Sequence, residues 1–327
     1  MNKPDTLVEL KSLDVHFNVS GAGFAGKAGI LRAVSDVSLT IRRGEVLGLV
    51  GESGSGKSTL GQAILRLVKP TSGQVLFDGN DITTLSRSEL HPYRRRMQVV
   101  FQDPYSALDP RQTIEDALIE PLEIHRIGAN RAVRLGRVHD LLTMVGLPPS
   151  HARRYPHEFS GGQRQRIGIA RAVALEPDFI VADEPVSALD VSIQAQILAL
   201  LRDLRKRLQL TLLFVSHDLA VIRYLSDRVA VMYLGRIVEI AKADDLYSRP
   251  QHPYTKALLA AVPSRTAGAQ RHKDLLIGDL PSPFDLPSGC SFRKRCPYAV
   301  SACATSVPQL QELAPGHAKA CIRSDIP

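Results

Sequence analysis

Short apolar runs alternate along this chain with longer stretches whose apolar residues recur at helical spacing. Runs at 45–50, 74–77 and 97–101 are compact enough for buried strands. Similar runs return at 179–182 and 211–215. The alternation of such runs with helical segments predicts an α/β core.

The pattern becomes helical from about 110 to 175, between the third and fourth of these runs. One predicted helix in this stretch places apolar residues at i, i+3, i+4 and i+7: Val138, Leu141, Leu142 and Val145. A later helix, between the runs at 179–182 and 211–215, has apolar residues on one side: Ile193, Ile197, Leu200 and Leu204. The α/β core is therefore interrupted by a helical insertion.

The last strands and the tail are marked by turn residues. Segments 228–233 and 236–240 are joined around Gly235 and read as a closing hairpin. The proline-rich segment 279–289 then opens a tail. We place the boundary of this C-terminal extension at 260/261, so that it covers residues 261–327.

Charge and hydropathy limit the classes of protein that fit. The formal net charge is +8, spread along the chain, and a basic surface is a simpler explanation than contact with acidic lipids or nucleic acid. No window of eighteen residues is apolar throughout, and residues 1–9 lack the apolar core of a signal peptide. We expect a protein that is cytosolic or bound to a membrane through partners.

A glycine-rich loop follows the first strand and precedes a helix predicted at 59–68. Its glycines let backbone amides approach phosphates, and the amino end of the helix adds positive potential. Lys57 would reach the β- and γ-phosphates of a nucleotide, and the Ser58 hydroxyl would bind Mg²⁺. The candidate nucleotide-binding residues here are Gly51, Glu52, Ser53, Gly54, Ser55, Gly56, Lys57, Ser58 and Thr59.

A second loop of small residues lies before a helix predicted at 163–175 and consists of Ser160, Gly161, Gly162 and Gln163. Its free amides at the start of a helix would also hold an anion. The alternative is an ordinary glycine turn that caps this helix. Because the helical insertion separates the two loops, they need not serve one ligand within one subunit.

The apolar run at 179–182 ends in two acids. Asp183 would hold Mg²⁺, directly or through water, and Glu184 would polarise the attacking water as general base. The alternative is an acidic strand-to-loop junction that binds nothing.

These motifs in this order resemble the ATP-binding subunits of ATP-binding cassette (ABC) transporters. The resemblance implies an α/β P-loop NTPase fold of the ABC type at 1–260, with a helical subdomain at about 110–175. It also implies that ATP lies between the Lys57 loop of one subunit and the Ser160 loop of its partner.

The resemblance assigns four further residues, each with a simpler alternative. Asp190 would lie in a loop that faces the partner subunit, or cap the following helix. His217 would contact the γ-phosphate, or be structural. Gln102 would touch the metal ion and the water and pass the nucleotide state to membrane subunits, or be a turn residue. Phe17 would stack on adenine, or pack in the core, and the insert 21–29 leaves its register open.

Several stretches are similar to the subfamily that imports oligopeptides and dipeptides, which also serves nickel and glutathione systems. They are Gly51–Ser53, Phe101–Tyr105, Pro185–Asp190, His252–Leu259 and the tail from Pro287. Because Glu184 is present, we expect a site that hydrolyses ATP.

All the cysteines lie in the tail, at Cys290, Cys296, Cys303 and Cys321. Four thiolates in a small proline-rich segment could ligate iron–sulfur or zinc, or could bind no metal. The spacing C-x₅-C-x₆-C-x₁₇-C lacks the C-x₂-C pairs usual in structural zinc sites. Some peptide-importer subunits carry a 4Fe–4S cluster in such a tail, and we expect one here.

The resulting expectation is an ATPase that energises peptide import from the cytoplasmic face of the cell membrane. Its partners would be a second ATP-binding subunit, two transmembrane permease subunits and an extracytoplasmic solute-binding protein, without nucleic acid. Import of nickel, glutathione or another small solute is the alternative within the subfamily. A soluble ABC ATPase acting on ribosomes or DNA usually has two cassettes or a coiled-coil insertion, and a P-loop kinase would leave Ser160–Gln163 unexplained.

Overall fold

The computed structural model describes residues 5–19, 29–103, 108–261, 281–282, 284 and 286–326. Residues 21–28 of the glycine-rich insert, Pro104 and Tyr105 of the quoted motif, and positions 279, 280, 283 and 285 lie outside these residues. The chain forms two compact units. The first comprises Met1–Ile41, Val46–Thr83 and Ser216–Pro327, and the second comprises Arg42–Glu45 and Thr84–Val215.

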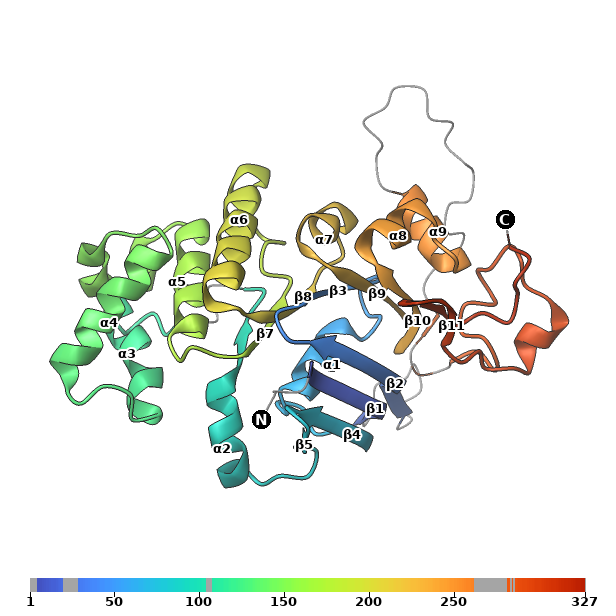
Figure 1. The fold of residues 1–327 in the computed structure, drawn as a ribbon, viewed down its shortest axis with the longest axis horizontal. Helices are drawn as coiled ribbons and strands as arrows, with labels where there is room; N and C mark the ends of the chain where they lie inside the picture. Colours follow the sequence, from blue (N-terminus) through green and yellow to red (C-terminus); the bar gives the residue numbers. More distant parts are fainter. Residues whose placement is uncertain are drawn as a thin grey trace. The chain divides into compact units, whose positions relative to one another are not determined.

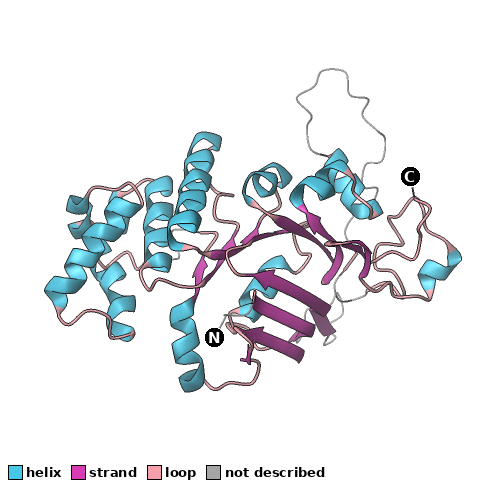
Figure 2. Cartoon of the chain, viewed as in Figure 1, coloured by secondary structure: helices cyan, strands magenta, loops and turns pink. Residues whose placement is uncertain are grey.

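The first unit contains a four-stranded sheet (Figure 2) in the order β2-β1-β4-β5. The strands are β1 (Thr6–Val19), β2 (Gly29–Arg42), β4 (Ser72–Phe77) and β5 (Asn80–Asp81). Alternate residues of β2 are buried at Val37, Leu39 and Ile41, as expected for a strand with one face on the core. Only β4 of this sheet was identified from the sequence.

A second group of strands in the first unit has the order β11-β12-β10-β9-β3. Its members are β3 (Val46–Val50), β9 (Arg228–Tyr233), β10 (Arg236–Lys242), β11 (Gln311–Ala314) and β12 (His317–Lys319). β3 is parallel to β9, and β10 is antiparallel to both β9 and β12. The hairpin predicted around Gly235 is confirmed, because Arg236 pairs with Tyr233.

The helices of the first unit are short: α1 (Lys57–Ile64), α7 (Leu219–Leu225), α8 (Ala243–Ser248), α9 (Pro253–Ala260) and the 3₁₀ turn η3 (Ser301–Ala304). α1 ends before the predicted Val68. Arg66 adopts a left-handed conformation, with φ 55°, and its Nε donates to the Ile82 carbonyl at 2.9 Å. The left-handed conformation of Arg66 turns the chain out of the helix, and the hydrogen bond to Ile82 holds its side chain in place.

The second unit contains three parallel strands in the order β8-β7-β6. They are β8 (Thr211–Val215), β7 (Phe179–Asp183) and β6 (Met97–Val100). β8 is buried along its whole length, which explains its continuous apolar run. These are the strands predicted at 97–101, 179–182 and 211–215.

Helices make up most of the second unit (Figure 1). They are α2 (Arg87–Arg96), α3 (Ile114–Ile124), α4 (Arg131–Met144), α5 (Gly161–Val173) and α6 (Val191–Leu208), with 3₁₀ turns η1 (Pro149–Arg153) and η2 (Pro156–Glu158). The predicted apolar face at Val138, Leu141, Leu142 and Val145 is fully buried. Within the described residues, none of the helices combines the length and hydrophobicity needed to cross a membrane.

The predicted face of α6 is only partly correct. Ile197 and Leu204 are buried, but Ile193 and Leu200 are half-buried. Leu198 and Leu201 complete the buried face instead. The helix is therefore rotated slightly from the orientation that the spacing predicted.

Candidate functional site

The glycine-rich loop connects β3 to α1 in the first unit, as predicted. Gly56 occupies the N-cap position of α1 with φ 102°. A Cβ at this position would lie 2.1 Å from the Ala33 carbonyl oxygen, so only glycine fits. The tight turn leads the loop into the amino end of α1, where free amides attract an anion.

Lys57 is the first residue of α1 and is 5% exposed. Its Nζ donates to the carbonyl oxygens of Gly51 and Glu52, each at 2.9 Å. The ammonium is thus held inside the loop by neutral acceptors that phosphate oxygens could replace. The hydroxyl of Ser55 is buried and has no hydrogen-bond partner among the described residues, whereas Ser58 and Thr59 are half-buried.

The sequence did not predict that Tyr254 and Arg295 contact the phosphate loop. The Glu52 amide donates to the Tyr254 hydroxyl at 2.9 Å, and Arg295 of the tail forms an ion pair with the Glu52 carboxylate at 2.8 Å. Tyr254 packs against Tyr233 and Phe292, with ring centroids 4.7 Å and 5.5 Å away. Burial raises the pKa of the Tyr254 phenol, so the hydroxyl stays neutral.

In the second unit, β7 delivers Asp183 and Glu184 at its carboxyl end, as predicted. Glu184 has a positive φ of 45°, and its amide donates to the Val215 carbonyl at 3.0 Å. Gln102, two residues after β6, donates from Nε2 to Glu184 Oε2 at 3.3 Å. The structure therefore brings Gln102 and Glu184 together.

The loop Ser160–Gln163 begins α5 in the same unit. Ser160 and Gln163 form a capping box: Ser160 N donates to Gln163 Oε1 at 3.1 Å, and Gln163 N donates to Ser160 Oγ at 3.4 Å. A Cβ on Gly162 would lie 2.5 Å from Ile193 Cγ2, which requires a small residue there. Ser160 remains exposed, so capping the helix leaves the loop accessible.

Asp190 occupies the N-cap position of α6, but its side chain makes no capping hydrogen bond. It is exposed. The simpler alternative, that Asp190 is present only to cap the helix, is therefore weakened.

Two predicted residues lie with the glycine-rich loop in the first unit. Phe17 is half-buried in β1, and His217 is exposed just before α7. Asp218, the next residue, caps α7 by accepting hydrogen bonds from the amides of Ala220 and Val221. The candidate residues are thus divided between the units, with Gln102, Asp183, Glu184, Asp190 and the Ser160 loop in the second.

The four cysteines are free thiols that line one small cavity in the first unit. Its volume of about 10 Å³ is close to the space that one water molecule needs. Burial raises the pKa of Cys290, and raises that of Cys296 to about 11, so these thiols are neutral. Within the described ranges, no group of three or more histidine, cysteine or acidic side chains is arranged to hold a metal ion. The four thiols lie around one cavity, but no observation on the described residues supports the iron–sulfur cluster expected from the sequence.

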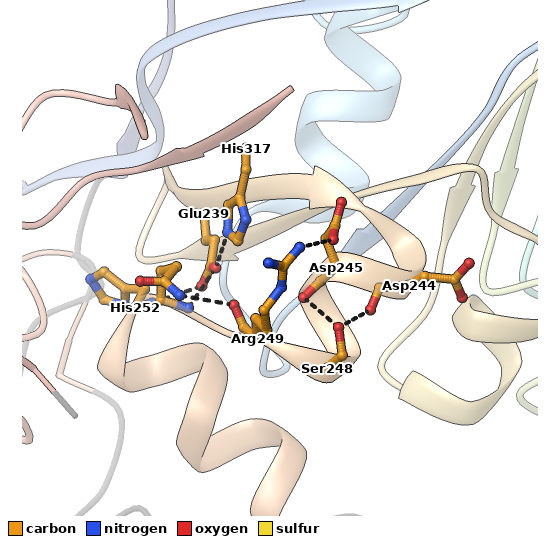
Figure 3. A network of polar contacts seen from close by, with 8 residues as sticks. Glu239, Asp244, Asp245, Ser248, Arg249, His252 and His317 are labelled. Atoms are coloured by element: carbon orange, nitrogen blue, oxygen red, sulfur yellow. Dashed lines mark hydrogen bonds and ion pairs between the residues drawn. The ribbon is translucent and has the colours of Figure 1, made fainter. Parts of the chain in front are cut away.

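A buried carboxylate ties the tail to β10. Glu239 is fully buried and accepts hydrogen bonds from His317 Nε2 at 2.7 Å and from the amides of Gln251 and His252 at 2.7 and 2.8 Å (Figure 3). His317 belongs to β12, and His252 precedes α9. One side chain therefore joins β12 and α9 to the strand between them.

The second unit contains a groove of about 170 Å³. It is lined by β6, α3 and α5, and its apolar side chains include Phe101 and Ile124, which are 44% and 57% exposed. The Gln165 amide reaches the Phe101 carbonyl at 3.5 Å. Two large apolar side chains are therefore exposed at a groove that also has polar lining residues, among them Gln165 and Arg171.

Two family profiles match this chain. The profile described as ABC transporter matches residues 34–187, and the profile described as oligopeptide/dipeptide transporter, C-terminal region, matches residues 238–303. The second match includes Cys290, Cys296 and Cys303.

Curated relatives match almost end to end. A Brucella ovis protein named for peptide import and ATP binding is 59% identical over 320 residues, which cover 98% of both chains. The oligopeptide transport ATP-binding protein AppF of Bacillus subtilis is 50% identical over 320 residues and 97% of both chains.

Solved structures match the larger part of the chain. The dimeric ATP-binding cassette MJ0796, bound to ADP and Pi, has a TM-score of 0.65 and 34% identity, over 72% of this chain and 99% of its own. CbiO1 of Clostridium perfringens, part of the transporter complex CbiONQ, has a TM-score of 0.65 and 27% identity, over 75% and 92%.

Proposed function

This chain belongs to the oligopeptide and dipeptide importer family of ABC transporter ATP-binding subunits, and from that premise we propose how its residues use ATP. It is an ATPase subunit that energises peptide import through an ABC transporter. The cassette is assigned to residues 1–260, with the helical subdomain at about 110–175, and the extension to 261–327.

The first unit binds the phosphates. Lys57 exchanges the carbonyls of Gly51 and Glu52 for β- and γ-phosphate oxygens, and the loop amides complete the cradle. The remaining loop residues, Ser53 to Gly56 and Thr59, approach the phosphates through their backbone. Phe17 stacks on adenine from β1, and His217 contacts the γ-phosphate.

Mg²⁺ would be held by Ser58, Gln102 and Asp183, whose oxygens are the ligands this ion prefers. When bound, it neutralises charge on the phosphates. Gln102 has a second task, which is to orient the Glu184 carboxylate through the contact at 3.3 Å.

Glu184 accepts a proton from the water that attacks the γ-phosphate. The observation that carries this role is the fixed position of Glu184: its left-handed backbone is anchored to Val215, and its carboxylate is held by Gln102. Strained backbone that the surrounding structure holds in place is frequent at active sites.

The Ser160–Gln163 loop, whose Ser160 is exposed, and Asp190 act on the ATP of a second ATP-binding subunit, identical or homologous. The matched MJ0796 cassette is dimeric. The amino ends of α1 in one subunit and α5 in the other then enclose one nucleotide from opposite sides.

The groove lined by β6, α3 and α5 is the proposed docking site of the permease. A short segment of one transmembrane subunit would cover Phe101 and Ile124 at the cytoplasmic face of the membrane, and the second transmembrane subunit would dock on the partner ATP-binding subunit. Gln102, next to Phe101 in the chain, links this groove to the catalytic carboxylate. An extracytoplasmic binding protein would deliver the peptide.

The role of Glu184 is tested by Glu184→Gln in the assembled transporter. We expect ATP binding to persist and turnover to fall about 10²–10⁴-fold, because the amide cannot take the proton. Glu176→Gln is the matched control, since Glu176 also has a positive φ but is exposed and paired with Arg137. Wild-type turnover by Glu184→Gln would contradict the assigned role.

For the tail, we keep the 4Fe–4S cluster as a proposal that rests on the convergence of four cysteines on one cavity. A cluster needs the thiols to move apart, since the cavity is only water-sized. Anaerobic purification tests this: bound iron and acid-labile sulfide are expected, and colourless, iron-free protein would overturn it.

A further inference from the structure

The C-terminal extension reaches the phosphate loop through one ion pair. Arg295 Nη1 lies 2.8 Å from Glu52 Oε2, although the residues are 243 positions apart. The Arg295 side chain is 6% exposed and that of Glu52 is 24% exposed. A pair so well buried is not a solvated surface contact.

Glu52 is held at three points. Its carboxylate binds Arg295, its amide donates to Tyr254, and its carbonyl accepts from Lys57. Arg295 therefore acts on the residue that shapes the position of Lys57. Any loss of Arg295 frees one of three restraints on the loop.

Charge gives Arg295 a second effect on the loop. Glu52 places a carboxylate in a loop that must accept the phosphates of ATP. Arg295 balances that charge, and its guanidinium is packed over the Tyr233 ring, 5.9 Å from the centroid. Without Arg295, the carboxylate would repel the incoming phosphates at short range.

We propose that Arg295 is a positioning residue for ATP, which neutralises Glu52 and fixes the phosphate loop around Lys57. This inference rests on the proposed role of the Lys57 loop as the ATP site. The C-terminal extension would therefore take part in nucleotide binding, because its Arg295 holds Glu52 of the phosphate loop.

The test measures ATP affinity of the full-length chain, together with KM for ATP and kcat of the assembled transporter. Arg295→Gln is expected to weaken ATP binding and raise KM about tenfold, with a smaller change in kcat, because a buried carboxylate loses its partner. Adding Glu52→Gln removes the repulsion and is expected to restore affinity to within about threefold of wild type. Lys294→Gln, which removes the charge of an exposed neighbour, is expected to bind ATP normally.

A rescue by the second substitution separates charge balance from a purely structural role. If Arg295→Gln binds ATP like wild type, or if Arg295→Gln/Glu52→Gln binds no better than Arg295→Gln, the proposal is wrong. Arg295→Lys retains the charge and is the variant to use if Arg295→Gln does not fold. Because the charge is kept, it is expected to lose less ATP affinity than the tenfold expected of Arg295→Gln, and a loss of tenfold or more would overturn the proposal.

Lys57→Ala distinguishes failure of this inference from failure of the proposed function. If Lys57→Ala loses ATP binding while Arg295→Gln keeps it, only the inference falls. If Lys57→Ala binds ATP like wild type, the loop is not the ATP site and both fall.

Discussion

At the scale of single residues, backbone conformation explains the position of the Glu184 carboxylate, the proposed general base. Glu184 is a non-glycine residue with φ 45°, a conformation that costs about 1–3 kcal/mol. The hydrogen bond that the Glu184 N–H donates to the Val215 carbonyl offsets part of that cost. The result is a carboxylate that leaves β7 at a fixed angle and meets Gln102.

Gly56 is a glycine of the phosphate loop that no other residue should be able to replace. Gly56→Ala is expected to lower ATP affinity at least tenfold and to destabilise the fold by about 2–4 kcal/mol, because its Cβ would overlap the Ala33 carbonyl. Thermal unfolding and ATP titration of the purified chain measure both effects.

Gly79→Ala supplies the control for Gly56→Ala. Gly79 also has a positive φ, of 77°, but its Cβ would meet no atom within 4 Å. It should cost only about 1 kcal/mol and leave ATP binding intact. Equal effects of the two substitutions would show that overlap with Ala33 is not the cause.

The sequence predicted the residues of local motifs and not their distant contacts. Gly51–Ser58 is readable because eight consecutive positions carry the phosphate loop. The ion pair of Arg295 with Glu52 joins residues 243 positions apart, and no local pattern marks it. An arginine beside a cysteine and a glutamate beside a glycine are individually ordinary, so only the fold pairs them.

At the scale of elements, the hairpin β11–β12 is fastened by polar contacts as well as by strand pairing. β12 pairs with β10 at only two positions, Glu239 with Lys319 and Ile240 with Ala318. The buried hydrogen bond between the His317 ring and the Glu239 carboxylate strengthens this short strand pairing.

His317→Ala should loosen this hairpin. We expect amide hydrogen exchange at 311–319 to accelerate about tenfold or more, because Glu239 loses one of three hydrogen-bond donors while staying buried. Gln311→Ala, at an exposed position of β11, is the control and should leave exchange unchanged. Unchanged exchange in His317→Ala would mean that strand pairing alone holds the hairpin.

Strands could be predicted where a short continuous apolar run marks a buried strand. The buried strands β3, β7 and β8 have continuous apolar runs and were found. β1 and β2 mix buried residues with exposed polar ones, so neither has a continuous apolar run, and they were missed as a sheet. In α6, Leu198 and Leu201 are as apolar as Leu200, so spacing could not determine which residues face the core.

At the scale of the whole molecule, one chain presents two complementary sets of groups. The first unit carries the Lys57 loop, and the second carries the proposed catalytic acid Glu184, the Ser160 loop and the groove with Phe101 and Ile124. In the proposed function, the Lys57 loop and Glu184 serve the chain's own ATP and the Ser160 loop serves that of a neighbour, so the chain is suited to act as a subunit.

Ile124→Glu tests the groove as the permease docking site. We expect co-purification with the membrane subunits to fall about tenfold or more, because a charge replaces an apolar contact, while the chain alone still binds ATP. Val133→Glu, at an equally exposed apolar position on α4, is the control and should co-purify normally. Normal co-purification of Ile124→Glu would place docking elsewhere.

The central claim is that the Ser160 loop acts on the ATP of a partner and not on that of its own subunit. Ser160→Arg tests it most directly, and two quantities are measured: ATP affinity of the chain alone and turnover of the assembled transporter. Ser150→Arg, at another exposed serine of the same unit, is the control. We predict that Ser160→Arg leaves ATP affinity of the chain alone within about twofold of wild type and lowers turnover of the transporter about tenfold or more. A loss of ATP binding by the chain alone, as large as that of Lys57→Ala, would contradict the account.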